Sequence, residues 1–259
     1  MRRGRVYVVG AGPGDPELLT VKAVRLLRQA EVVVFDRLVS PEILDLVPIG
    51  TTRIYAGKSP RNHHMPQEQI NELLAGLARS GRIVVRVKGG DPYIFGRGSE
   101  ETEYLASHNI PFEVVPGITA SSGGSAYAGI PLTHRGLATS VRYLTGHLRD
   151  GLDLDHDWSS LVDLNTTLVV YMGLTNFEHI AVALIGYGLD HALPAAAIQN
   201  ATTLRQRRVL GTLGNLAARV REAGLSAPVI FIIGRVVSLA DTLNWFQADT
   251  ADPGESATG

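Results

Sequence analysis

The stretch VVGAGPGDPELLT, residues 8–20, decides how the first half of the chain is interpreted. A hydrophobic run that begins at Val6 ends in a cluster of glycines, and a helix-like segment follows. A strand, a glycine-rich loop and a helix in this order are typical of nucleotide-binding α/β proteins. The stretch therefore predicts an α/β fold and leaves open which ligand its loop accepts.

The glycine spacing argues against a dinucleotide. The fingerprint Gly-x-Gly-x-x-Gly needs a third glycine for close packing of helix on strand, but counting from Gly10 that position is Asp15. An acid there would repel a pyrophosphate, and Pro13 removes an N–H group that would hold one. Because no Gly-Lys-Ser/Thr follows, the phosphate-binding P-loop is excluded too. The loop predicts either a ligand without phosphate or a turn with no ligand.

A second glycine cluster lies in VRVKGGDPYIFGRG, residues 85–98. Gly89 and Gly90 let the backbone approach a ligand closely, and Asp91 adds a carboxylate suited to a ribose or an ammonium group. Two such loops at the carboxyl ends of strands in one parallel sheet share a crevice. The alternatives are that the glycines serve only a turn and that Asp91 forms an Asx turn.

Composition narrows the class of protein. The 259 residues are 45% hydrophobic and 19% charged, which is typical of a soluble globular protein with room for two domains. No apolar run is long enough for a membrane span or a signal peptide, so we expect a cytoplasmic protein with no membrane partner. A net charge of −1 predicts no nucleic-acid partner. Without cysteines or a metal-binding histidine pattern, no metal is expected.

Strand-like and helix-like segments alternate along the first half of the chain, which favours a largely parallel sheet covered by helices there. In the first half, strands are predicted at 5–10, 31–36, 52–56, 82–87 and 112–115, and helices at 16–29, 41–46, 67–79 and 99–108. Residues 114–136, rich in glycine and small polar residues, predict a hinge with one short helix. Beyond it, strands are predicted at 140–146, 167–172, 195–199, 208–213 and 228–234, and helices at 176–187 and 215–223.

The pattern therefore predicts an N-terminal α/β domain over residues 1–117, with the hinge at about 115–120. A C-terminal α/β domain follows over 118–247. The last segment, 248–259, is small, polar and acidic, which favours a disordered tail.

Seven blocks between residues 5 and 246 resemble, in order and spacing, the tetrapyrrole methylase family: GAGPGDPELLTVKA, VVVFDRLVS, RVKGGDPYIFGRGSEE, VPGITASSGGSAYAGIPLTHR, TGHL, VVYMG and LNWF. Within it they are similar to the uroporphyrinogen-III C-methyltransferases. The resemblance implies two α/β domains with S-adenosylmethionine in a cleft between them, in a homodimer. It also implies methylation of uroporphyrinogen III at C2 and C7 to precorrin-2, for sirohaem or cobalamin, with S-adenosylhomocysteine as the second product. No dehydrogenase or chelatase region is recognised, so we expect a stand-alone methylase.

The resemblance also implies cofactor contacts from both domains. The implied residues are Pro13, Gly89, Gly90, Asp91, Ile94, Thr119, Ala120, Met172 and Ala201. Two of them have simpler interpretations: Met172 follows an apolar strand and would suit a core, and Thr119 would suit a helix cap.

Two further residues are implied in proton transfer, Asp36 as acceptor and Lys58 as donor. A methylated pyrrole becomes cationic and has to lose a proton, so a carboxylate nearby is chemically sensible. The alternatives for Asp36 are an ion pair with Arg37 or Lys58, or a helix cap.

The implied substrate carries eight carboxylates, so a nearly neutral protein needs a local group of arginines to bind it. Arg97 and Arg135 lie in the matching blocks, with Arg142 as a further candidate. Glu100 follows Arg97 by three residues and would orient it on a helix, or bond a pyrrole N–H. The alternative is that these arginines are solvated surface residues.

Three other functions remain open on the sequence. A later corrin-ring methyltransferase has the same fold, although the blocks DRLVS and GIPLTHR argue against it. A non-catalytic adenosylmethionine-binding protein would keep the glycine loops without the arginines. A nicotinamide oxidoreductase is disfavoured by the glycine spacing.

Overall fold

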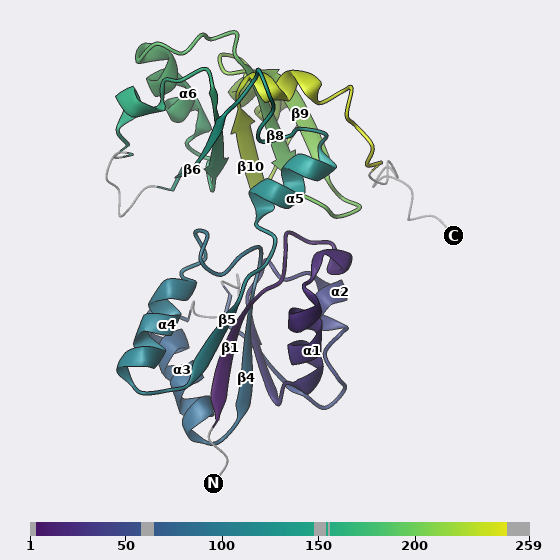
Figure 1. Cartoon of the computed structure of the whole chain (residues 1–259), viewed down its shortest axis with the longest axis vertical. Helices are drawn as coiled ribbons and strands as arrows, with labels where there is room; N and C mark the ends of the chain where they lie inside the picture. The colour runs from purple at the N-terminus through teal and green to yellow at the C-terminus, as the bar shows by residue number, and fades with distance from the viewer. Residues whose placement is uncertain (1–3, 58–64, 148–153, 155, 248–259) are drawn as a thin grey trace. The chain divides into compact units, whose positions relative to one another are not determined.

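A computed structural model of the chain describes residues 4–57, 65–147, 154 and 156–247. The chain divides into two compact units, Met1–Gly123 and Gly124–Gly259, and Figure 1 labels several elements of each. The division falls inside helix α5, Ala120–Tyr127, the one helix that the structure describes in the glycine-rich segment 114–136. Each unit contains its own sheet with helices, so the predicted two-sheet α/β fold is confirmed.

The first unit is built on a five-stranded sheet in the order β3-β2-β4-β1-β5. Every pair of neighbouring strands is parallel, as the alternation of elements predicts. All five carboxyl ends therefore lie along one edge of the sheet, where ligands bind in such folds. The strands are β1 Arg5–Gly10, β2 Val32–Phe35, β3 Thr52–Tyr55, β4 Ile83–Lys88 and β5 Phe112–Val115.

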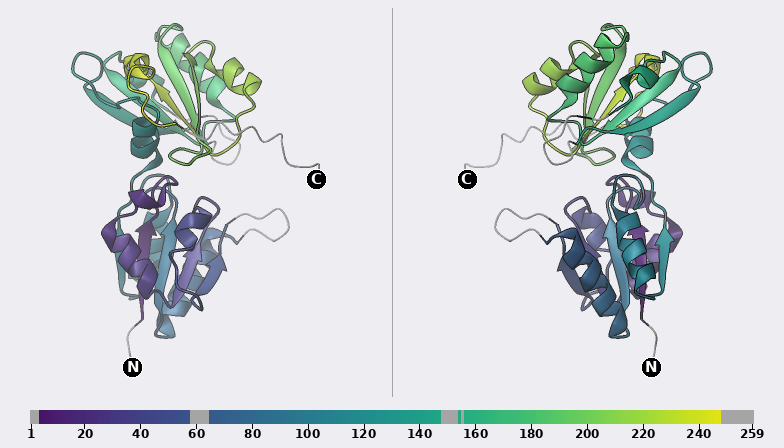
Figure 2. Two further views of the ribbon diagram at one scale, coloured as in Figure 1. Left: turned by 90° about the vertical axis from the view of Figure 1, so that its right-hand side faces the viewer. Right: turned by 90° about the vertical axis from the view of Figure 1, so that its left-hand side faces the viewer.

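Helices cover both faces of this sheet (Figure 2). On one face, α1 Val21–Gln29 and α2 Pro41–Leu44 pack with Val85 and Val87 of β4 in one apolar cluster. On the other, α3 Gln67–Arg79 and α4 Gly98–Ser107 pack with Val84 of the same strand. Successive side chains of a strand point to opposite faces, so β4 contributes to both cores.

The helix predicted over 16–29 is wrong in one respect, because it is two elements. A 3-10 turn, η1, spans Pro16–Leu18, and α1 begins only at Val21. Side-chain caps explain the break: Asp15 Oδ1 accepts from Glu17 N at 2.8 Å, and Thr20 Oγ1 accepts from Ala23 N at 3.1 Å. The ends of the other predicted helices and strands differ from the structure by no more than two residues.

The second unit has a mixed sheet in the order β6-β7-β10-β8-β9. Only β6 and β7 are parallel; β10 is antiparallel to both β7 and β8, and β8 to β9. The alternating pattern predicts a parallel sheet for the first half only, and the direction of the strands in the second sheet depends on where each connection returns the chain. The strands are β6 Ser140–Thr145, β7 Thr166–Tyr171, β8 Pro194–Gln199, β9 Arg207–Thr212 and β10 Val229–Ile233.

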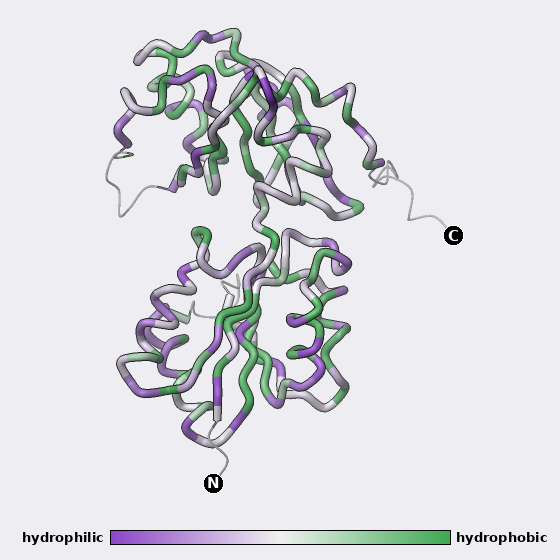
Figure 3. Tube along the Cα trace, in the orientation of Figure 1, coloured by the Kyte–Doolittle hydropathy of each residue, from purple (hydrophilic) through white to green (hydrophobic). Residues whose placement is uncertain are grey.

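The core of this unit lies under α6 Phe177–Gly186 and α7 Leu216–Glu222. Phe177 stacks on Phe231 of β10 with ring centroids 4.0 Å apart. Figure 3 shows hydrophobic residues concentrated along the central strands of each sheet. Two 3-10 turns complete the unit, η2 Trp158–Leu161 and η3 Arg235–Leu239. Among the described helices, none is both long and apolar enough to cross a membrane.

Candidate functional site

The loops after β1 and β4 meet at the carboxyl edge of the first sheet. Gly12 N donates to Gly90 O at 3.1 Å, and Gly90 N donates to Gly12 O at 2.6 Å, which forms a short antiparallel bridge. Both residues have positive φ, 72° and 67°, a region that glycine enters without strain. The two glycine clusters of the sequence are thus joined into one structure.

A third loop, after β5, packs against this bridge. A Cβ atom on Gly10 would lie 2.5 Å from Gly117 N, and one on Gly117 would collide with Gly90 O. Gly10 and Gly117 therefore serve close packing of the backbone. Gly90 also has room on one side, since a Cβ there would meet only Thr119 and Ala120, at 3.8 and 3.7 Å.

Asp91 ties the β4 loop to the β5 loop. Its Oδ1 accepts from Tyr93 N at 2.8 Å, the Asx turn that was considered from sequence, and its Oδ2 accepts from Gly117 N at 3.0 Å. Each carboxylate oxygen can accept a further hydrogen bond. Asp91 is therefore a structural residue of the edge that retains capacity for a ligand donor.

The first unit brings together most of the predicted cofactor contacts along this edge. Thr119 immediately precedes α5, and its carbonyl oxygen accepts hydrogen bonds from Ser122 N and Gly123 N at 3.0 and 3.1 Å. The half-buried residues of the group are Pro13, Gly89, Gly90, Asp91, Ile94, Thr119 and Ala120. Backbone amides, small side chains and one carboxylate therefore dominate the chemistry of this set.

The other two predicted contacts belong to the second unit. Met172 follows β7 with φ of 54°, and 49% of its surface is exposed, so the alternative that it is a core residue is wrong. Ala201 follows β8 and is buried. A Cβ on Gly124 of α5 would lie 3.0 Å from the Ala201 Cβ, so Ala201 packs against that helix.

Asp36 lies just past the carboxyl end of β2, with 24% of its side chain exposed. Its Oδ1 accepts from Leu38 N at 3.1 Å, and its Oδ2 accepts from Arg86 Nη2 at 3.3 Å. Asp36 therefore forms an ion pair, but its partner is Arg86, which the sequence analysis did not identify, and not Arg37. Lys58 lies outside the described residues.

Arg86 is part of a buried group that we call the β4–α4 polar cluster: Gln67, Asn71, Arg86, Lys88 and Glu101. Glu101 Oε1 accepts from Lys88 Nζ at 2.8 Å, from Arg86 Nε at 3.1 Å and from Gln67 Nε2 at 3.3 Å. Gln67 Nε2 also donates to Asn71 Oδ1 at 3.0 Å. Glu101 Oε2 is buried with no hydrogen-bond partner among the described residues.

The electrostatics of the cluster act most clearly on Lys88. Burial, and then the positive charge of Arg86, lower the pKa of Lys88 below its usual 10.5, against the opposing pull of Glu101. One signal for the cluster was present in the sequence. Arg86 and Lys88 alternate with valines in an otherwise apolar strand, which places both on one face.

The predicted substrate residues have different surroundings. Arg97, at the start of α4, forms the predicted pair with Glu100: Nε donates to Oε1 at 2.9 Å and Nη2 to Oε2 at 2.6 Å. These bonds raise the pKa of Arg97. Arg135 is exposed in a turn of the second unit. Arg142 bonds the carbonyl and hydroxyl of Ser160 at 2.7 and 3.0 Å, which favours a structural role.

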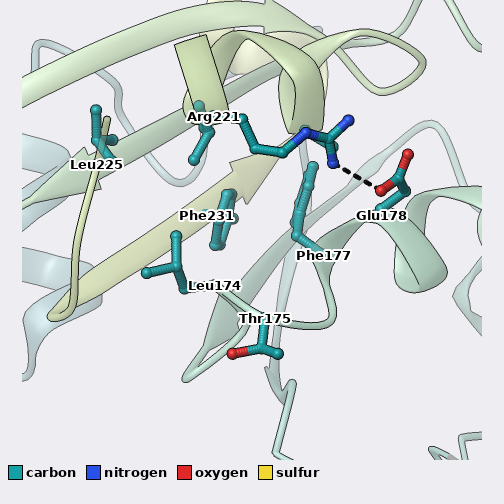
Figure 4. Close-up of a pocket in the computed structure, with 9 residues that line it drawn as sticks. Leu174, Thr175, Phe177, Glu178, Arg221, Leu225 and Phe231 are labelled. Atoms are coloured by element: carbon teal, nitrogen blue, oxygen red, sulfur yellow. Dashed lines mark hydrogen bonds and ion pairs between the residues drawn. The ribbon is translucent and has the colours of Figure 1, made fainter. Parts of the chain in front are cut away.

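Neither of two surface hollows contains a predicted site residue. A pocket of about 210 Å³ lies between α6 and α7 of the second unit, where Arg221 and Glu178 form an ion pair at 2.7 Å (Figure 4). A second, more open hollow of about 500 Å³ is lined by residues of α1 and of the segment before it, between Pro16 and Gln29. Within the described residues, no three histidine, aspartate or glutamate side chains are grouped so as to hold a metal.

The carboxyl edge of the first sheet is the candidate site, because the two joined glycine loops and Asp91 lie there.

Comparison with known proteins finds a matching family and similar proteins of related function. Residues 5–217 match the family described as Tetrapyrrole (Corrin/Porphyrin) Methylases. A siroheme synthase of Nitrosospira multiformis is 55% identical over 252 residues, which are 97% of this chain and 53% of that protein. The chain thus spans about half the length of the curated relatives that it matches.

Solved structures with a similar fold are also methyltransferases that act on tetrapyrroles. A uroporphyrin-III C-methyltransferase from Thermus thermophilus, complexed with S-adenyl homocysteine, is 42% identical with a TM-score of 0.77, over 90% of this chain and 93% of that one. A cobalt precorrin-4 methyltransferase is 26% identical with a TM-score of 0.80, over 90% and 95% of the two chains. These names describe the relatives.

Proposed function

The chain belongs to the tetrapyrrole (corrin/porphyrin) methylase family, and from that premise we propose that it methylates uroporphyrinogen III at C2 and C7 to give precorrin-2. The methyl donor in this proposal is S-adenosylmethionine. Support comes from the 42% identity to a uroporphyrin-III C-methyltransferase whose structure holds the demethylated cofactor. The siroheme synthase relatives indicate the same region of metabolism.

The carboxyl edge of the first sheet fits such a cofactor chemically. S-adenosylmethionine supplies an electrophilic methyl group on a sulfonium, and it carries a ribose and an ammonium but no phosphate. The two joined glycine loops offer backbone groups and Asp91, and residues 11–15 and 89–96 include no cation. A donor set of this kind suits hydroxyls and positive charge rather than pyrophosphate. We propose the nine cofactor contacts implied by the family resemblance, with Met172 and Ala201 contributing from the second unit.

The proposed roles of the remaining residues come from the family resemblance, and the charges of these side chains suit them. Arg97, held by Glu100, and Arg135 bind substrate carboxylates, for which the guanidinium fork is suited. Asp36 accepts the proton that the cationic, methylated ring has to lose, and Lys58 donates one. Much of the rate enhancement comes from holding the methyl donor and the carbon nucleophile in line. Asp36→Ala alone should therefore leave measurable activity.

The observation that carries this proposal is the joined pair of glycine loops with Asp91, one strand away from the held carboxylate of Asp36. To test it, the protein is incubated without oxygen with S-adenosylmethionine and enzymatically made uroporphyrinogen III, and mass spectrometry counts the added methyl groups. We expect two additions, and loss of both in the Arg97→Ala/Arg135→Ala variant. Arg28→Ala, an exposed arginine of α1, is the matched control and should keep both.

No addition despite calorimetric binding of S-adenosylmethionine would overturn the substrate assignment. A later corrin-ring methyltransferase would then be favoured, since the cobalt precorrin-4 methyltransferase has the same fold with a TM-score of 0.80. A binding protein without catalysis is the third outcome. The homodimer and the cytoplasmic location stay predictions, the first testable by light scattering on the purified chain.

A further inference from the structure

The β4–α4 polar cluster contains more charge than a hydrophobic core requires. Arg86 and Lys88 are 3% and 5% exposed, and Glu101 is fully buried. Burying charges costs free energy, and well-packed apolar side chains of similar volume are often as stabilising as a buried ion pair. Stability alone therefore does not explain why these charges lie inside the first unit.

The hydrogen bonds of Arg86 show what the cluster holds in place. Its Nε donates to Glu101, and its Nη1 donates to the carbonyl of Val87 at 3.0 Å. Because the guanidinium is planar, fixing these two nitrogens also fixes the direction of Nη2. That third nitrogen points out of the cluster to Oδ2 of Asp36.

Glu101 is held in its turn. Lys88 and Gln67 both donate to the oxygen that receives Arg86 Nε, so the carboxylate cannot rotate without losing several bonds. Asp36 is fixed on its other oxygen by Leu38 N. The chain of contacts thus leads from α3 and α4 through β4 to Asp36, the most exposed of these charged groups.

We propose that Arg86 is a positioning residue for methyl transfer: supported by Glu101 and Lys88, it holds the Asp36 carboxylate in the orientation that receives the proton of the methylated ring. In that step the proton bonds to a carboxylate oxygen of Asp36, and its electron pair stays with the ring, which loses its positive charge. The inference rests on the proposed role of Asp36.

A double-mutant cycle with Arg86→Lys and Asp36→Asn tests the inference. Lysine keeps the positive charge beside Glu101, but its single ammonium cannot reproduce the fork that spans Glu101 and Asp36. We expect Asp36→Asn to lower kcat by about 10²–10⁴-fold and Arg86→Lys to lower it by about 10-fold or more. The double variant should be no slower than Asp36→Asn alone, with unchanged calorimetric binding of S-adenosylmethionine.

A merely structural role gives a different result: Arg86→Lys then lowers kcat by the same factor in both backgrounds, which overturns the inference. Arg208→Lys is the matched control, since Arg208 also bonds a carboxylate, Asp241 at 2.9 Å, and two carbonyls. Its effect should be the same in both backgrounds. If Arg86→Lys does not fold by circular dichroism, Glu101→Asp replaces it, since shortening that carboxylate withdraws the same support.

The cycle also separates this inference from the proposed function. A wild-type protein that adds no methyl groups contradicts the proposed reaction. If the wild type is active and Asp36→Asn keeps full kcat, the proposed methyl transfer is still supported. That outcome contradicts the proposed role of Asp36 and therefore the positioning role of Arg86.

Discussion

The two faces of strand β4 differ in chemistry although they belong to the same six residues. Toward α1 and α2 the strand presents Val85 and Val87, which join an apolar cluster. Toward α3 and α4 it presents Val84, then Arg86 and Lys88. The polar residues come last, where the strand reaches the carboxyl edge of the sheet.

This contrast between the two faces explains how one strand can contribute both to stability and to a functional site. Burial of the apolar face stabilises the folded state, and this face tolerates small changes of side-chain volume. The polar face depends on complete pairing, because a buried charge that loses its partner is costly. Removing a charge and removing a methyl group should therefore have effects of very different size.

The largest effect is expected for Glu101→Gln. The variant leaves Arg86 and Lys88 as two buried cations without a buried carboxylate, and it should lower the free energy of unfolding by about 3–5 kcal/mol. Urea denaturation measures the change. Glu100→Gln on the same helix is the control, and a loss below about 1 kcal/mol for Glu101→Gln would mean that the cluster is not tightly coupled.

A second effect is expected in the pH dependence of stability. The pKa of Lys88 is lowered in the folded chain, so between that value and 10.5 the unfolded chain binds more protons and stability rises with pH. Each unit of lowering corresponds to about 1.4 kcal/mol. The stability of wild type relative to Lys88→Arg, which does not titrate, should increase as pH rises through this window, and a constant difference would contradict the prediction.

A smaller effect is expected on the apolar face. Ile43 of α2 is 1% exposed in the cluster with Val85 and Val87. Ile43→Val should cost about 0.5–1.5 kcal/mol by removing one buried methylene. Thermal unfolding measures it, and kcat should stay unchanged. A fall in kcat as large as that of Arg86→Lys would show that the two faces are not separate in function.

The smallest effect is expected for the exposed pair of Arg97 and Glu100, whose side chains are 53% and 49% exposed. Glu100→Gln should change the free energy of unfolding by about 0.2–1 kcal/mol, because solvent screens the pair. If Arg97, oriented by Glu100, binds substrate carboxylates, the KM for uroporphyrinogen III should change in Glu100→Gln while the free energy of unfolding changes little. An unchanged KM would mean that Arg97 is a solvated surface residue with no role in substrate binding.

Local patterns in the amino-acid sequence predict the elements of both units and the glycine-rich loops at the candidate site. Alternation of apolar residues, glycine clusters and caps act over a few neighbouring positions, so strands such as Arg5–Gly10 could be predicted. The residues that meet across the sheet are known only from the three-dimensional fold. Asp36 finds Arg86 50 residues away, and Asp91 finds Gly117 26 residues away. Such partners depend on strand order and direction, which no local pattern specifies; the antiparallel strands of the second sheet escaped prediction for the same reason.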